Sequence, residues 1–241
     1  MSDHFRAGVV FRRKRNSDQT CGVTMMVAGR ENADSSGDHL FLLSEAEQSM
    51  GMPLSSARRW TYEEALALVD EQEDRSVRYE YADAELLVTP APGGYHQRII
   101  LELFRLLDPY VRQYGLGEVR LGPSPVALIE RTIVQPDLFV VPSIEGKRPR
   151  ADTPVTSALV VVEVLSKGSH RHDRLTKRYL YQRAGVPEYW IVDQDTQVVE
   201  RWRPGTDRPE ILEAGLHWHP VPAIDPLVVD LVALFRSTLD D

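Results

Sequence analysis

Cysteine is almost absent from this chain, because Cys21 is the only thiol among 241 residues. A single cysteine excludes a disulfide within the chain and any zinc site built from cysteines, and it is typical of proteins kept in a reducing compartment. We therefore expect a cytoplasmic protein.

Long apolar runs are also lacking. No stretch approaches the ~20 residues that a membrane-spanning helix needs. The basic residues at 12–15 are not followed by the apolar segment of a secretory signal. The sequence therefore predicts no membrane partner.

A positive net charge is the third absence. Lysine and arginine number 28 against 36 aspartates and glutamates, for a formal charge of -8. This balance excludes a wholly basic surface that coats nucleic acid, but it leaves a local basic groove open. The hydrophobic and charged contents, 42% and 27%, are those of an ordinary globular protein. The length suits one large domain with an extension, or two small domains.

The first 56 residues differ from the rest. Residues 31–38 are small and polar without any period, which favours a loop or disorder. Residues 39–50 are mildly amphipathic and predict a short helix. Since Met50 directly precedes the first convincing element, a natural start there is a further hypothesis, and it predicts a stable, soluble chain beginning at Met50. We divide the sequence into an N-terminal extension, 1–56, and a domain, 57–241.

The domain reads as strands interrupted by helices, which indicates an α/β fold. We expect helices over 61–69 and 95–114, and strands over 77–90 in two pieces, 118–121, 126–130, 133–141, 158–165, 188–192 and 198–202, before a final strand and short helix within 225–235. Pro109 should kink the long helix or start a second segment. The strand, helix and strand over 158–192 predict a crossover packed on a sheet.

Glu163 stands alone as a charge in the apolar run at 159–165. Burying an unpaired carboxylate costs several kcal/mol or forces it to hold a proton. Metal binding is one reason for a chain to keep such a residue.

Asp137 is a second candidate, because it follows a proline and precedes the apolar residues 138–141. If the strands of Asp137 and Glu163 are neighbours, about 5 Å apart, their carboxylates can face one another. Such a pair repels unless a cation lies between, and Mg²⁺ prefers oxygen ligands of this kind. Lys177, one helical turn past Asp173, can supply a complementary charge that orients a water or stabilises a phosphate.

Each of these residues also has an ordinary explanation. Asp137 suits a turn, and Asp173 with Lys177 suits an ion pair across one helical turn, worth about 0.2–0.5 kcal/mol. Tyr181 suits core packing as well as a contact that holds the lysine. The order and spacing of the residues together, more than any single one, favour a functional site.

Three stretches carry a resemblance to known nucleases, and they read PDLFVV, VVVEVLS and HDRLTKRYLYQRAGVPEYWIVD. A proline–aspartate, an acid in the next strand and a lysine resemble the PD-(D/E)XK nuclease superfamily. More closely, the chain resembles the Uma-two family of restriction-endonuclease-like proteins, to which YEYADAELLVTPAP and the closing VVDLVALF are also similar. The resemblance covers residues 59–235.

This resemblance implies a restriction-endonuclease-like α/β fold: a mixed central β-sheet flanked by helices, with an extra N-terminal strand or helix and a C-terminal hairpin. It also implies an endonuclease that hydrolyses DNA phosphodiester bonds with Mg²⁺ or Mn²⁺. By the same resemblance, Asp137 and Glu163 are metal ligands and Glu80 is a third acid. The sequence departs from the superfamily at Leu165, where a lysine is usual, and Lys177 from the helix is its expected replacement.

DNA is the partner that the resemblance implies, and a homodimer is left open. Lys167, Arg171, Arg174 and His96 are candidate contacts to substrate phosphate. A solvated helix face also explains the basic residues, and a structural or capping role also explains His96. Ala84 stands where the family usually has glycine, which can alter the bend beside the third acid.

Two other functions stay open at this point. A catalytically inactive nucleic-acid-binding or assembly module would keep the fold, and both Leu165 and the acidic balance favour it. A hydrolase of small phosphate esters, such as nucleotides, would use the same acids.

Overall fold

The protein was examined as a computed structural model, which describes residues 9–15, 21–29, 39–42, 59–71, 77–90, 92–124, 126–166 and 169–239. The first three ranges form a small antiparallel sheet of β1 (Val9–Arg15), β2 (Cys21–Gly29) and β3 (His39–Leu42). The helix that we predicted over 39–50 is therefore wrong for its first four residues, because they pair with β2. The rest of that segment and the loop at 31–38 lie outside the described residues.

A six-stranded mixed sheet forms the centre of the domain, as expected. Its order is β11-β10-β9-β8-β7-β6. The strands are β6 (Gly117–Leu121), β7 (Leu138–Pro142), β8 (Val160–Val164), β9 (Tyr189–Asp193), β10 (Val198–Trp202) and β11 (Glu210–Leu212). Only β8 and β9 pair in parallel, and the helical crossover that was predicted joins them.

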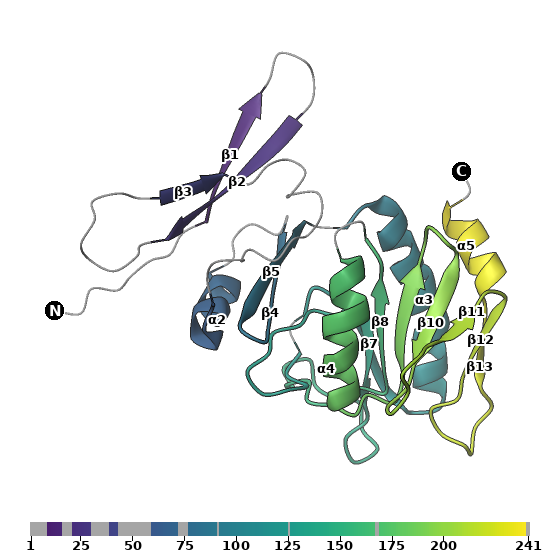
Figure 1. Ribbon diagram of the computed structural model, residues 1–241. Helices are drawn as coiled ribbons and strands as arrows, with labels where there is room; N and C mark the ends of the chain where they lie inside the picture. Colours follow the sequence, from purple (N-terminus) through teal and green to yellow (C-terminus); the bar gives the residue numbers. More distant parts are fainter. Residues whose placement is uncertain are drawn as a thin grey trace.

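Helices cover both faces of this sheet (Figure 1). One face carries α3 (Gly94–Gln113), α5 (Leu231–Leu239) and the hairpin of β12 (Gly215–Trp218) and β13 (Leu227–Asp230). The other face carries η1 (His172–Lys177), a π-helix, and α4 (Arg178–Arg183). A third apolar cluster joins α2 (Tyr62–Asp70) to the hairpin of β4 (Val77–Ala82) and β5 (Glu85–Pro90).

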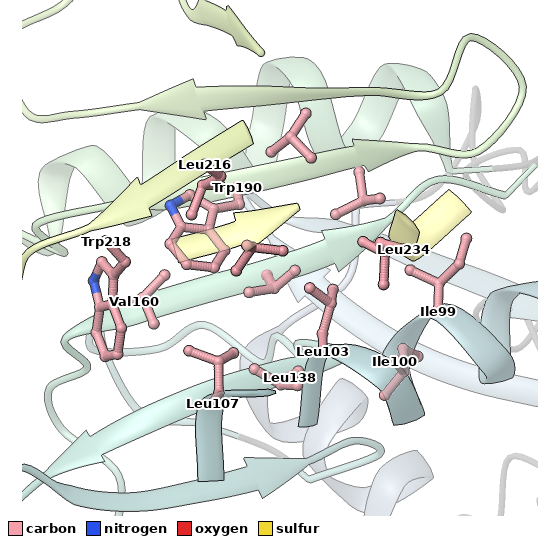
Figure 2. Close-up of a cluster of buried hydrophobic side chains, with 14 of the residues drawn as sticks. Ile99, Ile100, Leu103, Leu107, Leu138, Val160, Trp190, Leu216, Trp218 and Leu234 are labelled. Carbon is pink, nitrogen blue, oxygen red and sulfur yellow. The ribbon is translucent and has the colours of Figure 1, made fainter. Parts of the chain in front are cut away.

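The helix α3 buries one apolar stripe, as its spacing predicts. Leu103 and Leu107 pack beside Trp190 and Trp218 in the main core (Figure 2). The helix continues through Pro109, so no second segment begins there. Proline removes one backbone hydrogen bond from a helix, and buried side chains on both sides of it keep α3 on the sheet.

The chain before β7 contains less strand than predicted. The expected strand at 126–130 is reduced to a single bridge between Val126 and Val134, and β7 begins at Leu138. The reason is local: Pro136 has no N–H to donate to a ladder. In addition, the N–H of Gln135 donates to Glu80 Oε1 at 2.8 Å.

Strand alternation decides which face receives the predicted acid of β8. The even-numbered Val162 belongs to the core under α3, whereas Val161 belongs to the core under α4. Because successive side chains point to opposite faces, Glu163 shares its face with Val161. Glu163 therefore points towards the layer formed by η1 and α4.

The turn between β4 and β5 holds a strained residue. Asp83 and Ala84 have φ of 52° and 66°, a left-handed pair that suits the twist of a two-residue hairpin. Left-handed backbone costs a residue with a Cβ roughly 1–2 kcal/mol. We expect Ala84→Gly to raise the free energy of unfolding by about 1 kcal/mol, measured by urea denaturation. Ala214→Gly, at an exposed position without positive φ, should lower it; a decrease in both variants would contradict the strain.

Candidate active site

Asp137 and Glu163 are brought opposite each other by the pairing of β7 with β8. In this antiparallel ladder Leu138 lies opposite Val162, so the residues one step outward, Asp137 and Glu163, form the next facing positions. Both are buried, with 3% and 2% of their surface exposed. The expectation that these strands are neighbours is confirmed.

Asp137 is held by cations and a main-chain donor. Arg78 Nη1 donates to Oδ1 at 2.5 Å, His96 Nε2 lies 2.9 Å from Oδ2, and the N–H of Val164 donates to Oδ2 at 2.9 Å. Burial alone would raise the pKa of Asp137, but the hydrogen bond and charge of His96, with the charges of Arg78 and Lys177, outweigh it. The pKa of Asp137 is therefore held well below its ordinary value, and the carboxylate is ionised.

Lys177 reaches back from η1 into a group of acids, as predicted from the sequence. Its Nζ lies 2.9 Å from Glu163 Oε1, 3.0 Å from Glu80 Oε1 and 3.3 Å from Asp173 Oδ1. The hydroxyl of Tyr181 donates to the same oxygen of Glu163 at 3.0 Å. Tyr181 thus contacts Glu163, and it shares the oxygen of that acid with Lys177.

The π-helical turn places two of the three charged residues of η1, Asp173 and Lys177, inside the protein. Asp173 and Lys177 are buried, whereas Leu175 between them is exposed. The hydroxyl of Tyr189 donates to the carbonyl oxygen of Asp173 at 3.2 Å, which ties η1 to β9. Single π-helical turns are rare in proteins overall, but those that do occur are often found at functional sites.

These contacts define a carboxylate cluster, whose members are Asp137, Glu163, Glu80 and Asp173. Within the described part of the chain, Arg78 and Lys177 are the arginine and lysine that pair with it. Burial, followed by the neighbouring carboxylates, raises the pKa of Glu163 well above 4.5, although Lys177 opposes the shift. Burial would lower the pKa of Lys177, but the carboxylates around it raise it, so the lysine keeps its proton.

The cluster lines one small pocket, together with both cations and His96. The remaining lining residues are Thr89, Pro92, Val164, Ser166 and Ser169. The pocket lies where β8 ends, β7 begins and α3 starts, which are the elements that supply Glu163, Asp137 and His96. The pocket is small and polar, and its lining brings the four carboxylates, both cations and His96 together.

The donor set of the pocket suits a hard divalent cation. Mg²⁺ is commonly held by only one or two carboxylates and keeps several waters, and Glu163 Oε2 has no hydrogen-bonded partner in the described part of the chain. The excess of carboxylates over cations favours added positive charge. Within those same ranges no three His, Cys, Asp or Glu side chains are already grouped at metal-binding geometry. The acids of the cluster are therefore not arranged as a complete metal site in this structure.

Most of the residues predicted to contact phosphate are not placed in the pocket, unlike the acids. Arg174 is paired with Asp193 at 2.9 Å and with Glu200 at 2.7 Å, and it does not line the pocket. Arg171 is exposed, and Lys167 lies outside the described residues. Of the predicted set, His96 alone is placed in the pocket, where it contacts Asp137.

Two residues of the site escaped the sequence reasoning. Arg78 lies two positions before Glu80 on β4, and strand alternation would have placed both on one face. Gly122 donates its N–H to the carbonyl oxygen of Asp137 at 2.9 Å, and a Cβ there would lie 2.4 Å from the carbonyl oxygen of Pro136. Glycine at 122 thus lets the chain pass close to Asp137. The sequence gives only a weak sign of this glycine's role, namely the proline that follows it.

Comparison with known proteins shows the family and the fold of this chain. The family model Uma2, described as a putative restriction endonuclease, matches residues 62–231. The chain belongs to the Uma2 family. A solved structure of a putative nuclease belonging to DUF820, from Anabaena variabilis, superposes with a TM-score of 0.58 at 20% identity, covering 74% of this chain and 99% of that one. This match shows the fold that the Uma2 chain shares with that nuclease.

Two further comparisons bear on the Uma2 chain. No curated protein matches it. Among the residues that the structure describes, no helix has the length and apolar character needed to cross a membrane.

Proposed function

We propose that this Uma2 protein is a metal-dependent endonuclease that hydrolyses DNA phosphodiester bonds with Mg²⁺ or Mn²⁺. The observation that carries the proposal is the pairing of Asp137 with Glu163 on adjacent strands, inside a buried cluster whose carboxylates outnumber the arginine and lysine side chains that pair with them among the described residues. A purely structural cluster would be expected to balance its charges, because unpaired buried charge is costly. The nuclease family supports a nucleic acid as the substrate.

In this proposal each group of residues has a separate task. Asp137 and Glu163 would hold the cation, which supplies a Lewis acid for the phosphate and a bound water of lowered pKa. Lys177 would orient that water or stabilise charge on the phosphate. Its pairs with Glu80 and Asp173 would keep it charged and in place while Glu163 contacts the metal.

Glu80 has two candidate tasks. Its Oε1 forms an ion pair with Lys177 and accepts from the N–H of Gln135, which supports a role in positioning the lysine. Its role as a third metal ligand stays a prediction and would use the other oxygen. Mn²⁺ affinity in Glu80→Gln separates the two, because only a ligand role predicts a clear loss.

Nicking of supercoiled plasmid in the presence of Mg²⁺ or Mn²⁺ tests the function. We expect the wild-type protein to nick plasmid and Asp137→Asn to lose about 10²–10³-fold in rate, a typical loss for a group that organises transition-state charge. Glu213→Gln is the matched control, since Glu213 is exposed and outside the pocket. Equal rates for Asp137→Asn and the wild type would contradict the assignment.

The same assay separates the other two functions. Hydrolysis of small phosphodiesters without plasmid cleavage would favour a hydrolase of small phosphate esters. Leu165, where the superfamily has lysine, specifically favours a non-catalytic binding or assembly module. That module predicts neither cleavage nor a calorimetric signal with millimolar Mn²⁺.

A further inference from the structure

Arg78 is the one cation of the pocket that is only partly used. Its Nη1 contacts Asp137 Oδ1, and no other hydrogen bond or ion pair of its guanidinium is found within the described ranges. The side chain is 13% exposed and lines the pocket. Its remaining N–H groups are therefore available to a ligand that enters there.

The two oxygens of Asp137 are held by unlike partners. Oδ2 accepts from the main-chain N–H of Val164 and from the ring of His96, both fixed by the elements that carry them. Among the described residues, Oδ1 contacts only Arg78, at the end of a long side chain. Oδ1 is consequently the oxygen of Asp137 that a cation can take over without disturbing the backbone.

We propose that Arg78 is a catalytic residue of the site with two successive contacts. It neutralises Asp137 while the metal site is empty, and it releases Oδ1 to the incoming cation and binds the non-bridging oxygens of the scissile phosphate. This inference rests on the proposed function and adds a substrate contact to it. The ion pair between Arg78 and Asp137 would thereby be replaced by two others, one between the metal and Asp137 and one between Arg78 and the phosphate.

The chemistry of the side chain suits this task. A guanidinium presents five N–H donors in a planar fork that matches two phosphate oxygens, whereas an ammonium offers a single point of charge. Lys177 is less suited, since three carboxylates already surround it. Arg174 is also less suited, since Asp193 and Glu200 hold it away from the pocket lining.

The test measures metal affinity and cleavage separately in Arg78→Gln. Calorimetry with Mn²⁺ and no DNA should show affinity about fivefold or more above wild type, because a competing cation has been removed. Single-turnover nicking of plasmid at saturating Mn²⁺ should fall about 10²–10³-fold, as expected when a donor to transition-state charge is lost. Tighter metal binding with slower cleavage is the signature that a merely structural arginine would not produce.

Two further variants keep the result interpretable. Arg120→Gln is the matched control, since Arg120 has the same 13% exposure and pairs with Glu118, but does not line the pocket; both readouts should stay within about twofold of wild type, against the fivefold or larger coupling expected at Arg78. Arg78→Lys keeps the competing charge without the fork. It should bind Mn²⁺ like the wild type and still nick about tenfold more slowly.

Three results would overturn the proposal. Weaker Mn²⁺ binding by Arg78→Gln, with an unchanged melting temperature, would mean that Arg78 orients Asp137 for the metal. Wild-type nicking rates in both Arg78→Lys and Arg78→Gln would show that Arg78 does not contact the scissile phosphate. A wild-type protein that neither binds Mn²⁺ nor nicks plasmid would instead refute the proposed function, and this inference with it.

Discussion

Lys177→Met is expected to lower the free energy of unfolding by about 3–5 kcal/mol, the usual cost of removing one partner from a buried ion pair. The side chain is buried, and its ammonium is the centre of three ion pairs. Methionine of similar length would leave Glu163, Glu80 and Asp173 without that cation. The protein would then be close to the limit of its stability, since domains are commonly stable by only 5–15 kcal/mol.

Urea denaturation at neutral pH measures this loss. Lys147→Met is the control, because Lys147 is exposed and its substitution should change stability by less than about 0.5 kcal/mol. The deficit of Lys177→Met should narrow as the pH falls towards 4.5, because burial raises the pKa of Glu163 above that value and a protonated Glu163 no longer needs the charge of the lysine. A deficit below about 1 kcal/mol at neutral pH would show that the three acids do not depend on Lys177.

Glu163→Gln is expected to change activity and stability in opposite directions. The rate of plasmid nicking should fall by about 10³-fold or more, because the cation loses one of its two proposed carboxylates. The free energy of unfolding should rise at neutral pH, because burial penalises the charged form of Glu163 and raises its pKa. The amide removes a charge that burial penalises and can still accept from Tyr181 and Lys177.

The pH dependence of this gain has a definite sign. The folded-state pKa of Glu163 is raised above its ordinary value of 4.5, so the folded state binds its proton more tightly than the unfolded chain. Its contribution to stability is complete below pH 4.5 and is lost as the pH rises through the folded-state pKa. Without metal, Glu163→Gln should therefore melt further above wild type at pH 8 than at pH 5.

Added Mn²⁺ should reverse the order of the melting temperatures of Glu163→Gln and the wild type. A ligand that binds only the folded state stabilises it by mass action, so the wild type should gain melting temperature and Glu163→Gln should not. Glu213→Gln, at an exposed acid, should follow the wild type in every condition. If Glu163→Gln melts below wild type at pH 8 without metal, the carboxylate is a structural partner of Lys177 and not a strained ligand.

Opposite effects on activity and stability are expected of a functional site. Groups that are unfavourable in the free protein persist when the rest of the fold tolerates their cost. Among the described residues, a cluster of four buried carboxylates with one arginine and one lysine as ion-pair partners is such an arrangement.

The sequence by itself predicted five of the six strands of the central sheet, the crossover, and the two acids as candidate site residues; β11 was not expected. These features are local: strands alternate with a period of two, helices repeat every 3.6 residues, and a lone charge is visible in the apolar run around Glu163. The stripe that predicted α3 is continuous, so the helix was found even with Pro109 inside it. Asp137 and Glu163 face each other because their two segments are neighbours in the sheet, and no other contact was needed to predict this.

Only the tertiary structure decided which partners these acids have. Arg78 reaches Asp137 across 59 positions of sequence, and the N–H of Gln135 reaches Glu80 across 55. The bridge of Tyr81 with Ile133, which docks the β4–β5 hairpin on the chain before β7, has no local signal in the sequence. Contacts between distant segments depend on how whole elements pack, because the free energy that forms them comes from burial shared over many residues and not from the few residues in contact.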